Sequence, residues 1–229
     1  LKTSVFSNFK KAYEPRPFDI LEDKTSTLGF RSSANYNTQL FALPFELSFG
    51  TELLTENYEF SLSKNLYQSQ PGNGSIQGDA FSAISQKRNY NNYFLQMELW
   101  LTAKLHLEAG LAFNKTKYSL EDVFDKNSVA QETPFTFGGI WTPRMGLSYK
   151  VGNGKNIFIA VSKGFSVPAV SETLTPEGQI NNDLKPEIGV NYEVGFKGNW
   201  LENKLYTEVA FYSTQITNLL VARRTAEDQ

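Results

Sequence analysis

Long segments in which apolar and polar residues alternate are the feature of this sequence that most restricts its fold. The clearest segment runs from Leu105 to Phe113, where every second residue is apolar and the residues between them are mostly polar or small. A period of two places these two sets on opposite faces of a β-strand. The sequence therefore predicts an all-β fold. The same pattern recurs at residues 93–102, 145–151, 192–197 and 205–212.

The lengths of the alternating segments point to a membrane. We place nine strands, at residues 2–9, 26–37, 45–62, 87–101, 105–118, 139–150, 156–165, 188–199 and 204–219. Many exceed ten residues, whereas strands of soluble domains usually have about five or six. A tilted strand needs about 9–11 residues to cross a bilayer, and its side chains alternate between lipid and the barrel interior. The prediction is an antiparallel up-and-down meander that forms part of a transmembrane β-barrel.

The connections between the predicted strands alternate between long and short. The long ones cover residues 10–25, 63–86, 119–138 and 166–187, and the short ones cover 38–44, 102–104, 151–155 and 200–203. Outer-membrane barrels have short periplasmic turns and long extracellular loops, so a meander across that membrane produces this order. Two short connections also contain turn residues, Gly152-Asn153-Gly154 and Glu202-Asn203. We therefore expect the long loops outside the cell and the tight turns at the periplasmic rim.

Composition excludes several kinds of function. The chain has 22 lysine and arginine residues against 24 aspartate and glutamate residues, which leaves no basic surface for nucleic acid. It has no cysteine, and His106 is its one histidine, so thiolate chemistry and multi-histidine metal sites are excluded within this chain. No Gly-x-Ser-x-Gly nucleophile motif occurs. We expect no catalytic residue, no metal and no cofactor, and hence a protein that is not an enzyme.

A soluble β-rich binding module is the alternative that the alternation leaves open. Such a domain would have to bury both faces of its sheet. The polar face carries Gln96, Glu98, Glu193 and Lys197, and charged groups are costly to bury without partners. A barrel with a water-filled interior accepts these side chains, which favours the barrel.

Both ends of the chain are interpreted as cut ends. The sequence begins at Leu1 without a signal peptide, and it finishes with the polar stretch 225–229 rather than the terminal aromatic residue usual in outer-membrane barrels. We expect residues 1–229 to form one partial β-barrel domain. A detached part of a barrel has two unpaired edges, so we also expect it to close into a smaller sheet, to oligomerise edge to edge or to require detergent.

The segment from Val161 to Arg224 resembles the late barrel of TonB-dependent outer-membrane receptors. The matching residues are Gly164, Phe165 and Pro168 in Ser162–Pro168, Pro186 and Glu187 in Leu184–Glu187, and Glu193 and Gly195 in Asn191–Lys197. Each motif is loose by itself, but their order and spacing are specific. The upstream segments 13–18, 114–118 and 141–144 are similar to receptors of this family for iron complexes of the siderophore type.

This resemblance implies a 22-stranded barrel closed by an N-terminal plug domain, in the outer membrane of a Gram-negative bacterium. It implies uptake of an iron complex, driven by TonB acting through the plug, with outer-membrane lipid as a further partner. The chain contains no plug, so we expect it to supply only part of the barrel wall. Import of glycans or peptides by the same family is the alternative. A barrel protease or phospholipase is disfavoured, because the one histidine lies at the periplasmic rim.

The family-motif residues are interpreted as structural. Pro186 fixes φ at the first residue of a strand, where no ladder donor is needed, and Glu187 is interpreted as solvated. Gly164 and Gly195 are expected to relieve crowding or to permit strand curvature.

The ligand-binding residues are unknown, with two weak candidates. Arg223 and Arg224 follow the last predicted strand on the side of the long loops, where they would meet an anionic iron chelate. His106 has no second histidine or cysteine beside it and is interpreted as an ordinary solvated or hydrogen-bonded histidine.

Overall fold

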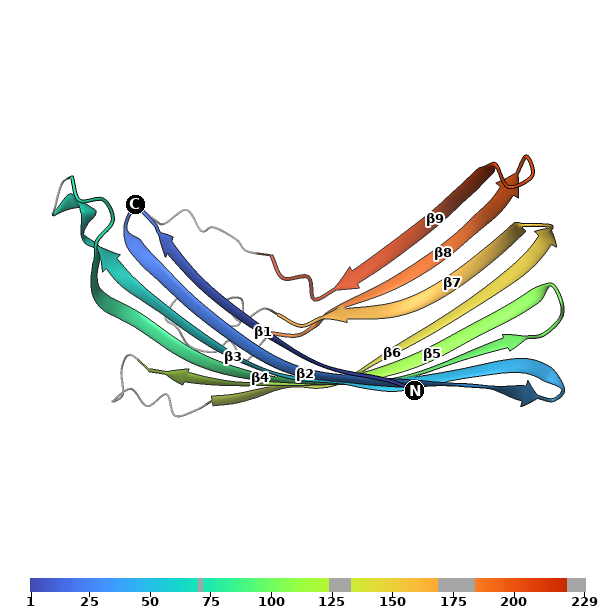
Figure 1. Cartoon of the computed structure of the whole chain (residues 1–229), viewed down its shortest axis with the longest axis horizontal. Coiled ribbons are helices and arrows are strands. Elements are labelled where there is room, and N and C mark those ends of the chain that lie inside the picture. The colour runs from blue at the N-terminus through green and yellow to red at the C-terminus, as the bar shows by residue number, and fades with distance from the viewer. Residues whose placement is uncertain (70–71, 124–132, 169–183, 222–229) are drawn as a thin grey trace.

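Nine antiparallel strands form one sheet in chain order in the computed structural model (Figure 1). The structure describes residues 1–69, 72–123, 133–168 and 184–221. The fold class predicted from the sequence is confirmed. No helix in these described ranges has both the length and the apolar character needed to cross a membrane. The strands are β1 (Lys2–Pro15), β2 (Asp19–Leu40), β3 (Leu43–Asn65), β4 (Gln77–Trp100), β5 (Leu105–Asp122), β6 (Thr133–Gly152), β7 (Lys155–Ser166), β8 (Glu187–Trp200) and β9 (Leu205–Thr217), with one turn of 3-10 helix, η1 (Leu66–Gln68), after β3.

The strands at the start of the chain are longer than predicted. β2 begins at Asp19 rather than near residue 26, and β4 begins at Gln77 rather than near residue 87. The ladder between β1 and β2 runs unbroken from the Lys2–Ser33 pair to the Pro15–Ile20 pair. Apolar alternation marks only the part of a strand that faces lipid, whereas backbone pairing continues into the polar part. The strands predicted from the apolar pattern were therefore too short at the end away from the tight turns.

The tight turns lie together at one end of the sheet (Figure 1). They are residues 41–42, 101–104, 153–154 and 201–204, and the other four connections join the strands at the opposite end. This segregation agrees with the predicted meander. The strict alternation of lengths is wrong at the first connection, because only residues 16–18 separate β1 from β2.

The turn between β2 and β3 has an unusual backbone for its sequence. Phe41 has φ 52° and Ala42 has φ 63°, so both residues adopt the left-handed conformation. A two-residue turn of type I′ needs positive φ at both positions, which favours asparagine and glycine. At the turn between β6 and β7, Gly154 supplies a positive φ of 67°, as the sequence predicted.

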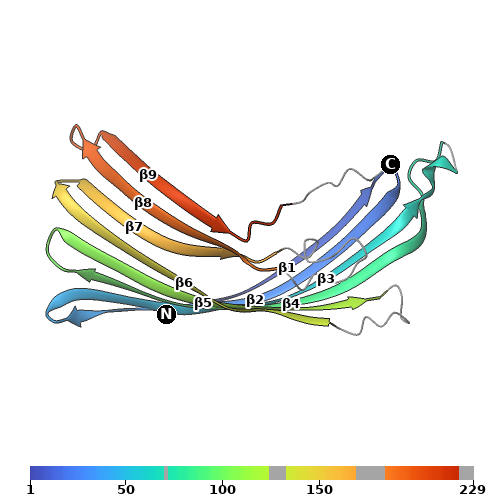
Figure 2. The same ribbon diagram turned by 180° about the vertical axis from the view of Figure 1, so that it is seen from behind.

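The sheet is curved into an open trough, and Figure 2 shows it from behind. β1 and β9 are its two free edges, because each pairs with one neighbour only. The closure into a smaller sheet that we expected for a detached segment is not seen among the described strands. An open curved sheet of this kind has the shape of one section of a barrel wall.

Contacts that pass over an intervening strand identify the concave face. Arg144 on β6 contacts Gln96 on β4, and the Tyr118 hydroxyl on β5 donates a hydrogen bond to the Pro168 carbonyl beyond β7 (3.2 Å). Strands two positions apart are separated by about 10 Å, so curvature must bring these side chains together. The polar residues of the alternating pattern therefore line the inside of the trough, and the apolar residues cover the outside.

The apolar outer face is bounded by aromatic residues. Tyr93, Phe113 and Trp141 form one row across β4, β5 and β6, and Tyr149 and Trp200 lie near the tight turns. Trp141 and Tyr149 are about 26 Å apart along β6. With the strand tilt usual in barrels, of about 40°, the distance along the membrane normal is about 20 Å, close to the apolar band of outer-membrane barrels. Exposed side chains between these rows include Leu95, Met97, Leu111, Met145, Ile159, Val161 and Val194.

Candidate functional site

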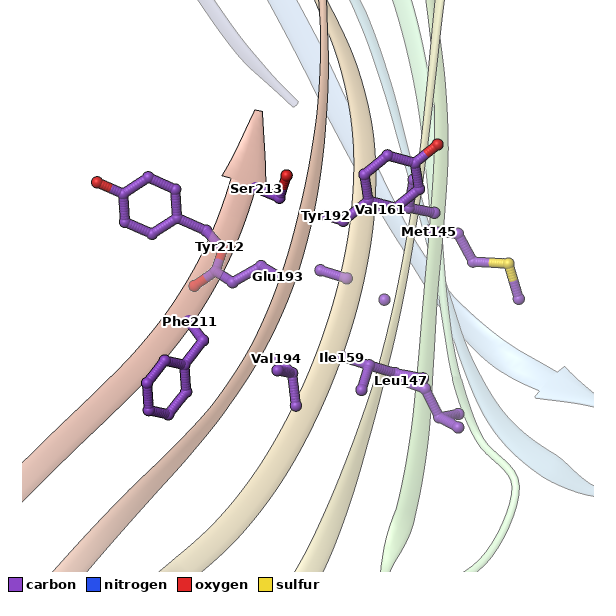
Figure 3. Close-up of a pocket in the computed structure, with 12 residues that line it drawn as sticks. Met145, Leu147, Ile159, Val161, Tyr192, Glu193, Val194, Phe211, Tyr212 and Ser213 are labelled. Carbon is purple, nitrogen blue, oxygen red and sulfur yellow. The ribbon is translucent and has the colours of Figure 1, made fainter. Parts of the chain in front are cut away.

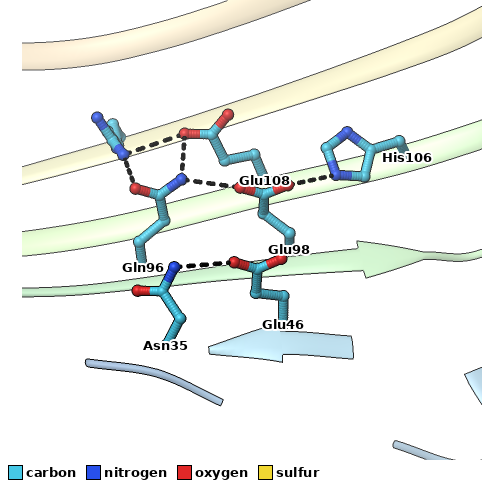
Figure 4. Close-up of polar contacts among 7 residues, drawn as sticks. Asn35, Glu46, Gln96, Glu98, His106 and Glu108 are labelled. Carbon is cyan, nitrogen blue, oxygen red and sulfur yellow. Dashed lines mark hydrogen bonds and ion pairs between the residues drawn. The ribbon is translucent and has the colours of Figure 1, made fainter. Parts of the chain in front are cut away.

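A hydrogen-bonded network crosses β4, β5 and β6 on the inner face (Figure 4). Arg144 contacts Oε1 of Gln96, and its Nη2 lies 3.2 Å from Oε1 of Glu108. The Gln96 amide donates to Oε1 of Glu98 (3.1 Å) and to Oε1 of Glu108 (3.2 Å). Oε2 of Glu98 in turn lies 3.2 Å from Nε2 of His106. Every member of this network is placed by the period of two along its strand, which aims alternate side chains into the trough.

Gly110 makes this network possible. The register places Gln96, Gly110 and Arg144 in one row across the three strands. A Cβ atom at Gly110 would lie 2.8 Å from Nε of Arg144, inside any ordinary contact distance. The glycine therefore leaves the space through which the guanidinium passes over β5.

Further ion pairs line the inner face toward the end with the longer connections. Nη2 of Arg88 lies 3.1 Å from Oε1 of Glu56, and Nε of Arg31 donates to Oε2 of Glu52 (2.6 Å). Partners in each pair stand directly opposite each other on neighbouring strands. Because each of these cations has a carboxylate partner, this part of the wall is polar but close to neutral.

Tyr118 is the centre of a buried group on the inner face, beyond the aromatic row and so outside the membrane-spanning part of β5. Its ring packs edge-on against Phe137, with centroids 5.7 Å apart, and its hydroxyl donates to the Pro168 carbonyl. Burial raises the pKa of the Tyr118 hydroxyl above its ordinary value. A bulge between β5 and β6, at Asn114 and Thr116, brings Phe137 to this face. The group ties the chain after β7 to the inside of the trough.

In the part of the chain that the structure describes, the acidic residues and His106 of the inner face do not gather into a metal site. No group of three or more histidine, cysteine, aspartate or glutamate residues there has the geometry of a metal site. His106 pairs with Glu98 and packs on Trp100, with ring centroids 4.8 Å apart. Charged side chains that pair with one another across neighbouring strands, such as Arg144 with Glu108 and Arg88 with Glu56, suit a water-filled passage or a docking wall.

The family-motif residues lie on and around β7 and β8. Gly164 stands opposite Gly189, and a Cβ atom there would meet none of the described atoms within 4 Å. At Gly195 the Cβ would collide with the Phe158 ring and lie 2.9 Å from the Val209 carbonyl oxygen. Phe158 therefore uses the space above Gly195.

Pro168, Phe165 and Glu193 are placed by one backbone hydrogen bond and by the strand ladders. The Pro168 carbonyl accepts the hydrogen bond from Tyr118, and Phe165 stands opposite Ile188 in the β7–β8 ladder. Glu193 lies opposite Ala160 and Tyr212 on the inner face.

Pro186 and Glu187 connect the start of β8 to the residues after β9. Pro186 immediately precedes the strand rather than beginning it, and its carbonyl accepts a hydrogen bond from Asn218 (3.1 Å). Oε1 of Glu187 accepts from the backbone N–H of Leu220 (2.8 Å), so this carboxylate has a specific partner as well as solvent contact. Arg223 and Arg224 lie outside the described residues.

Tyr118 and Arg144 end the segments 114–118 and 141–144 that resemble receptors for iron complexes, but sequence reasoning gave neither residue a role. Gln96 and Glu98 were recognised as polar-face residues, but not as parts of a network. The available signal was the charged residue in the otherwise small and apolar stretch around Arg144, on the same face as Gly146. It becomes interpretable only once the register is known.

Comparison with known proteins agrees with this architecture. The family model described as "TonB dependent receptor-like, beta-barrel" matches residues 3–229. The chain is 28% identical over 152 residues to the ferric-pyoverdine 358 receptor of Pseudomonas putida, a match that covers 66% of this chain and 17% of the relative.

Solved structures of outer-membrane receptors share the fold. The ferripyoverdine receptor of Pseudomonas aeruginosa superposes with a TM-score of 0.73 at 16% identity, covering 93% of this chain and 30% of the receptor. The alcaligin receptor of Bordetella pertussis superposes with a TM-score of 0.70 at 17% identity, covering 95% of this chain and 34% of the receptor. The chain thus spans about a third of the solved receptors that it matches.

The family model covers nearly the whole chain, and the sheet has the apolar outer face and polar inner face of a membrane barrel. Together these two findings decide the family. The chain belongs to the β-barrel domain of the TonB-dependent receptors, which are transporters of the Gram-negative outer membrane and not enzymes.

Proposed function

We propose that this chain is part of the barrel wall of a receptor that imports an iron complex of the siderophore type. The observation that carries the proposal is the sequence similarity to the ferric-pyoverdine 358 receptor, which extends over 152 residues. Further support comes from the structural relatives, which include receptors for ferripyoverdine and alcaligin. Residues 1–229 would then form a partial barrel domain whose remaining strands and plug lie elsewhere in the protein.

The inner face suits this role. The network around Arg144, at the level of the membrane, presents paired charges and amides. A polar solute or a plug domain can contact these groups without binding tightly to an unpaired charge. The group around Tyr118 lies closer to the outside of the cell and holds Pro168, just after β7, against the inner face. In the proposed receptor, TonB acts through the plug and not through this wall.

The family-motif residues are proposed to hold the wall in shape. Gly195 gives space to Phe158, and Glu187 holds the backbone after β9. None of the described motif residues is proposed to bind the ligand. Arg223 and Arg224 stay candidates for contact with an anionic chelate.

Uptake by the full-length receptor tests the proposal. A strain lacking the gene would be grown under iron limitation with single siderophores of the pyoverdine, hydroxamate, catecholate and citrate types, and uptake of radioactive iron would be measured. We expect loss of uptake with one type, restored by the intact gene but not by a version without the TonB-contacting segment. Unchanged iron uptake, together with lost growth on an oligosaccharide or peptide, would instead assign the receptor to the import of that nutrient.

A further inference from the structure

The wall continues well beyond the aromatic row at the end with the longer connections. At the level of the membrane, the outer face presents apolar side chains such as Ile159 and Val194 (Figure 3). On β3, Asn65 lies about 45 Å along the strand from Thr51, which pairs with Tyr93 of the aromatic row. Polar contacts, rather than the bilayer, therefore have to hold this end of the sheet in place.

The Asn65 side chain joins two separate connections at this end. Its amide nitrogen donates to the backbone carbonyl of Arg16 (2.8 Å) in the β1–β2 connection and to the Ser75 hydroxyl (3.1 Å) in the β3–β4 connection. Its amide oxygen accepts from the backbone N–H groups of Tyr67 and Ile76, at 3.2 Å each. An asparagine amide has two donor hydrogens and two acceptor positions, so this side chain uses all four.

Further hydrogen bonds strengthen the same junction. The backbone N–H of Asn65 donates to the Phe18 carbonyl (3.3 Å), so Asn65 serves two of the three carbonyls of the β1–β2 connection. Gln77, which stands opposite Asn65 in the ladder, donates from its side-chain amide to Oε2 of Glu22 on β2 (3.3 Å). The strand that follows the first connection is thereby tied to the strand that follows the second.

The choice of asparagine at this position is informative. Asn65 is also the N-cap of η1, and asparagine, aspartate and serine cap a helix about equally well. Aspartate and serine could both accept the N–H of Tyr67. Aspartate, however, has no donor for the Arg16 carbonyl, and serine has one donor where two are used. Capping alone therefore does not require asparagine, whereas the bridge between the two connections does.

We propose that Asn65 is a latch that joins the β1–β2 connection (16–18) and the described residues of the β3–β4 connection (66–69 and 72–76) into one rigid unit at the extracellular rim. Carbonyls of the first connection and amides of the second depend on the same side chain, so neither connection opens without breaking contacts of the other. In the receptor, the rim above β1 to β4 is a fixed part of the entrance, whichever ligand is imported.

Hydrogen exchange of the purified full-length receptor in detergent tests the latch. Exchange rates would be followed for the amide of Arg16, which donates to the Asp19 carbonyl (2.8 Å), and for the amides of Tyr67 and Ile76. Asn65→Ala removes all four side-chain hydrogen bonds and should speed exchange about tenfold on both connections. Faster exchange at Tyr67 and Ile76 alone would overturn the proposal, because Asn65 would then act only within its own connection.

Asn65→Asp separates the two halves of the latch. The carboxylate still accepts from Tyr67 and Ile76 but cannot donate to the Arg16 carbonyl, so exchange should rise about tenfold at Arg16 alone. The matched control is Asn73→Ala, which changes an exposed asparagine of the same connection and should exchange as the wild type does at all three amides. Wild-type exchange at Arg16 in Asn65→Asp, or an equal rise there in Asn73→Ala, would refute the latch.

Discussion

Arg144 passes over Gly110 to reach Gln96 on the far side of β5, so that one guanidinium joins three strands of the wall. The contact exists because the sheet is concave on this side and because the intervening residue has no side chain. Side chains of β4, β5 and β6 are thereby joined in one network, which also includes Glu108. Adding a side chain at Gly110 should therefore change the stability of the wall by displacing Arg144.

Replacing Gly110 by alanine should destabilise the barrel by about 1 kcal/mol, because Arg144 must give up its contacts with Gln96 and Glu108. The matched control is Gly146→Ala, also on the inner face, where a Cβ would meet only the Ile159 carbonyl oxygen at 3.7 Å. That variant should be neutral or slightly stabilising, since glycine weakens a strand. Urea unfolding of the full-length receptor measures both, and equal effects would argue against the role given to Gly110.

Replacing Gly195 by alanine should cost about 1–3 kcal/mol, because the new methyl group meets a ring and a backbone oxygen that cannot both move. Gly164→Ala, on the neighbouring strand and the same face, should be tolerated because its Cβ would enter open space. Thermal unfolding of the two variants compares them directly. If Gly164→Ala proves the more damaging, the space above Gly164 is occupied by a part of the protein outside the described residues.

Replacing Ala42 by glycine should stabilise the protein by about 1 kcal/mol, because a left-handed backbone strains any residue that has a Cβ. Ala42→Val should act in the opposite direction, since a branched side chain tolerates positive φ less well than alanine. The midpoint of thermal unfolding gives the sign of each change. A loss of stability in Ala42→Gly would show that the turn adopts another conformation in the membrane.

Replacing Tyr118 by phenylalanine should cost about 1 kcal/mol at neutral pH, because the Pro168 carbonyl loses its donor. The pKa of Tyr118 is raised in the folded protein, mainly by burial, from its ordinary value of 10.0. Above that pH the unfolded chain releases the proton while the folded protein retains it, so this contribution to stability falls as the pH rises. The free energy of unfolding, measured from pH 8 to pH 11, should decline more steeply for the wild type than for Tyr118→Phe. Parallel curves would contradict the raised pKa of the Tyr118 hydroxyl.

The sequence by itself determined which side chains face lipid and which face the interior. The period of two is a local property, and the apolar residues at 105, 107 and 111 are apolar because the membrane is on one side of the strand. The same pattern, with the segregation of turns at one end, was enough to predict the meander and its direction.

Only the tertiary structure decided which polar residues meet. Gln96 and Arg144 are 48 residues apart in the chain, and their contact depends on the registers of two strand pairs and on the curvature between them. A shift of either register by two residues would keep the apolar pattern intact and yet separate them. The extent of β1 and β2 beyond the membrane was likewise decided by backbone pairing, because polar residues continue a ladder without leaving an apolar signature in the sequence.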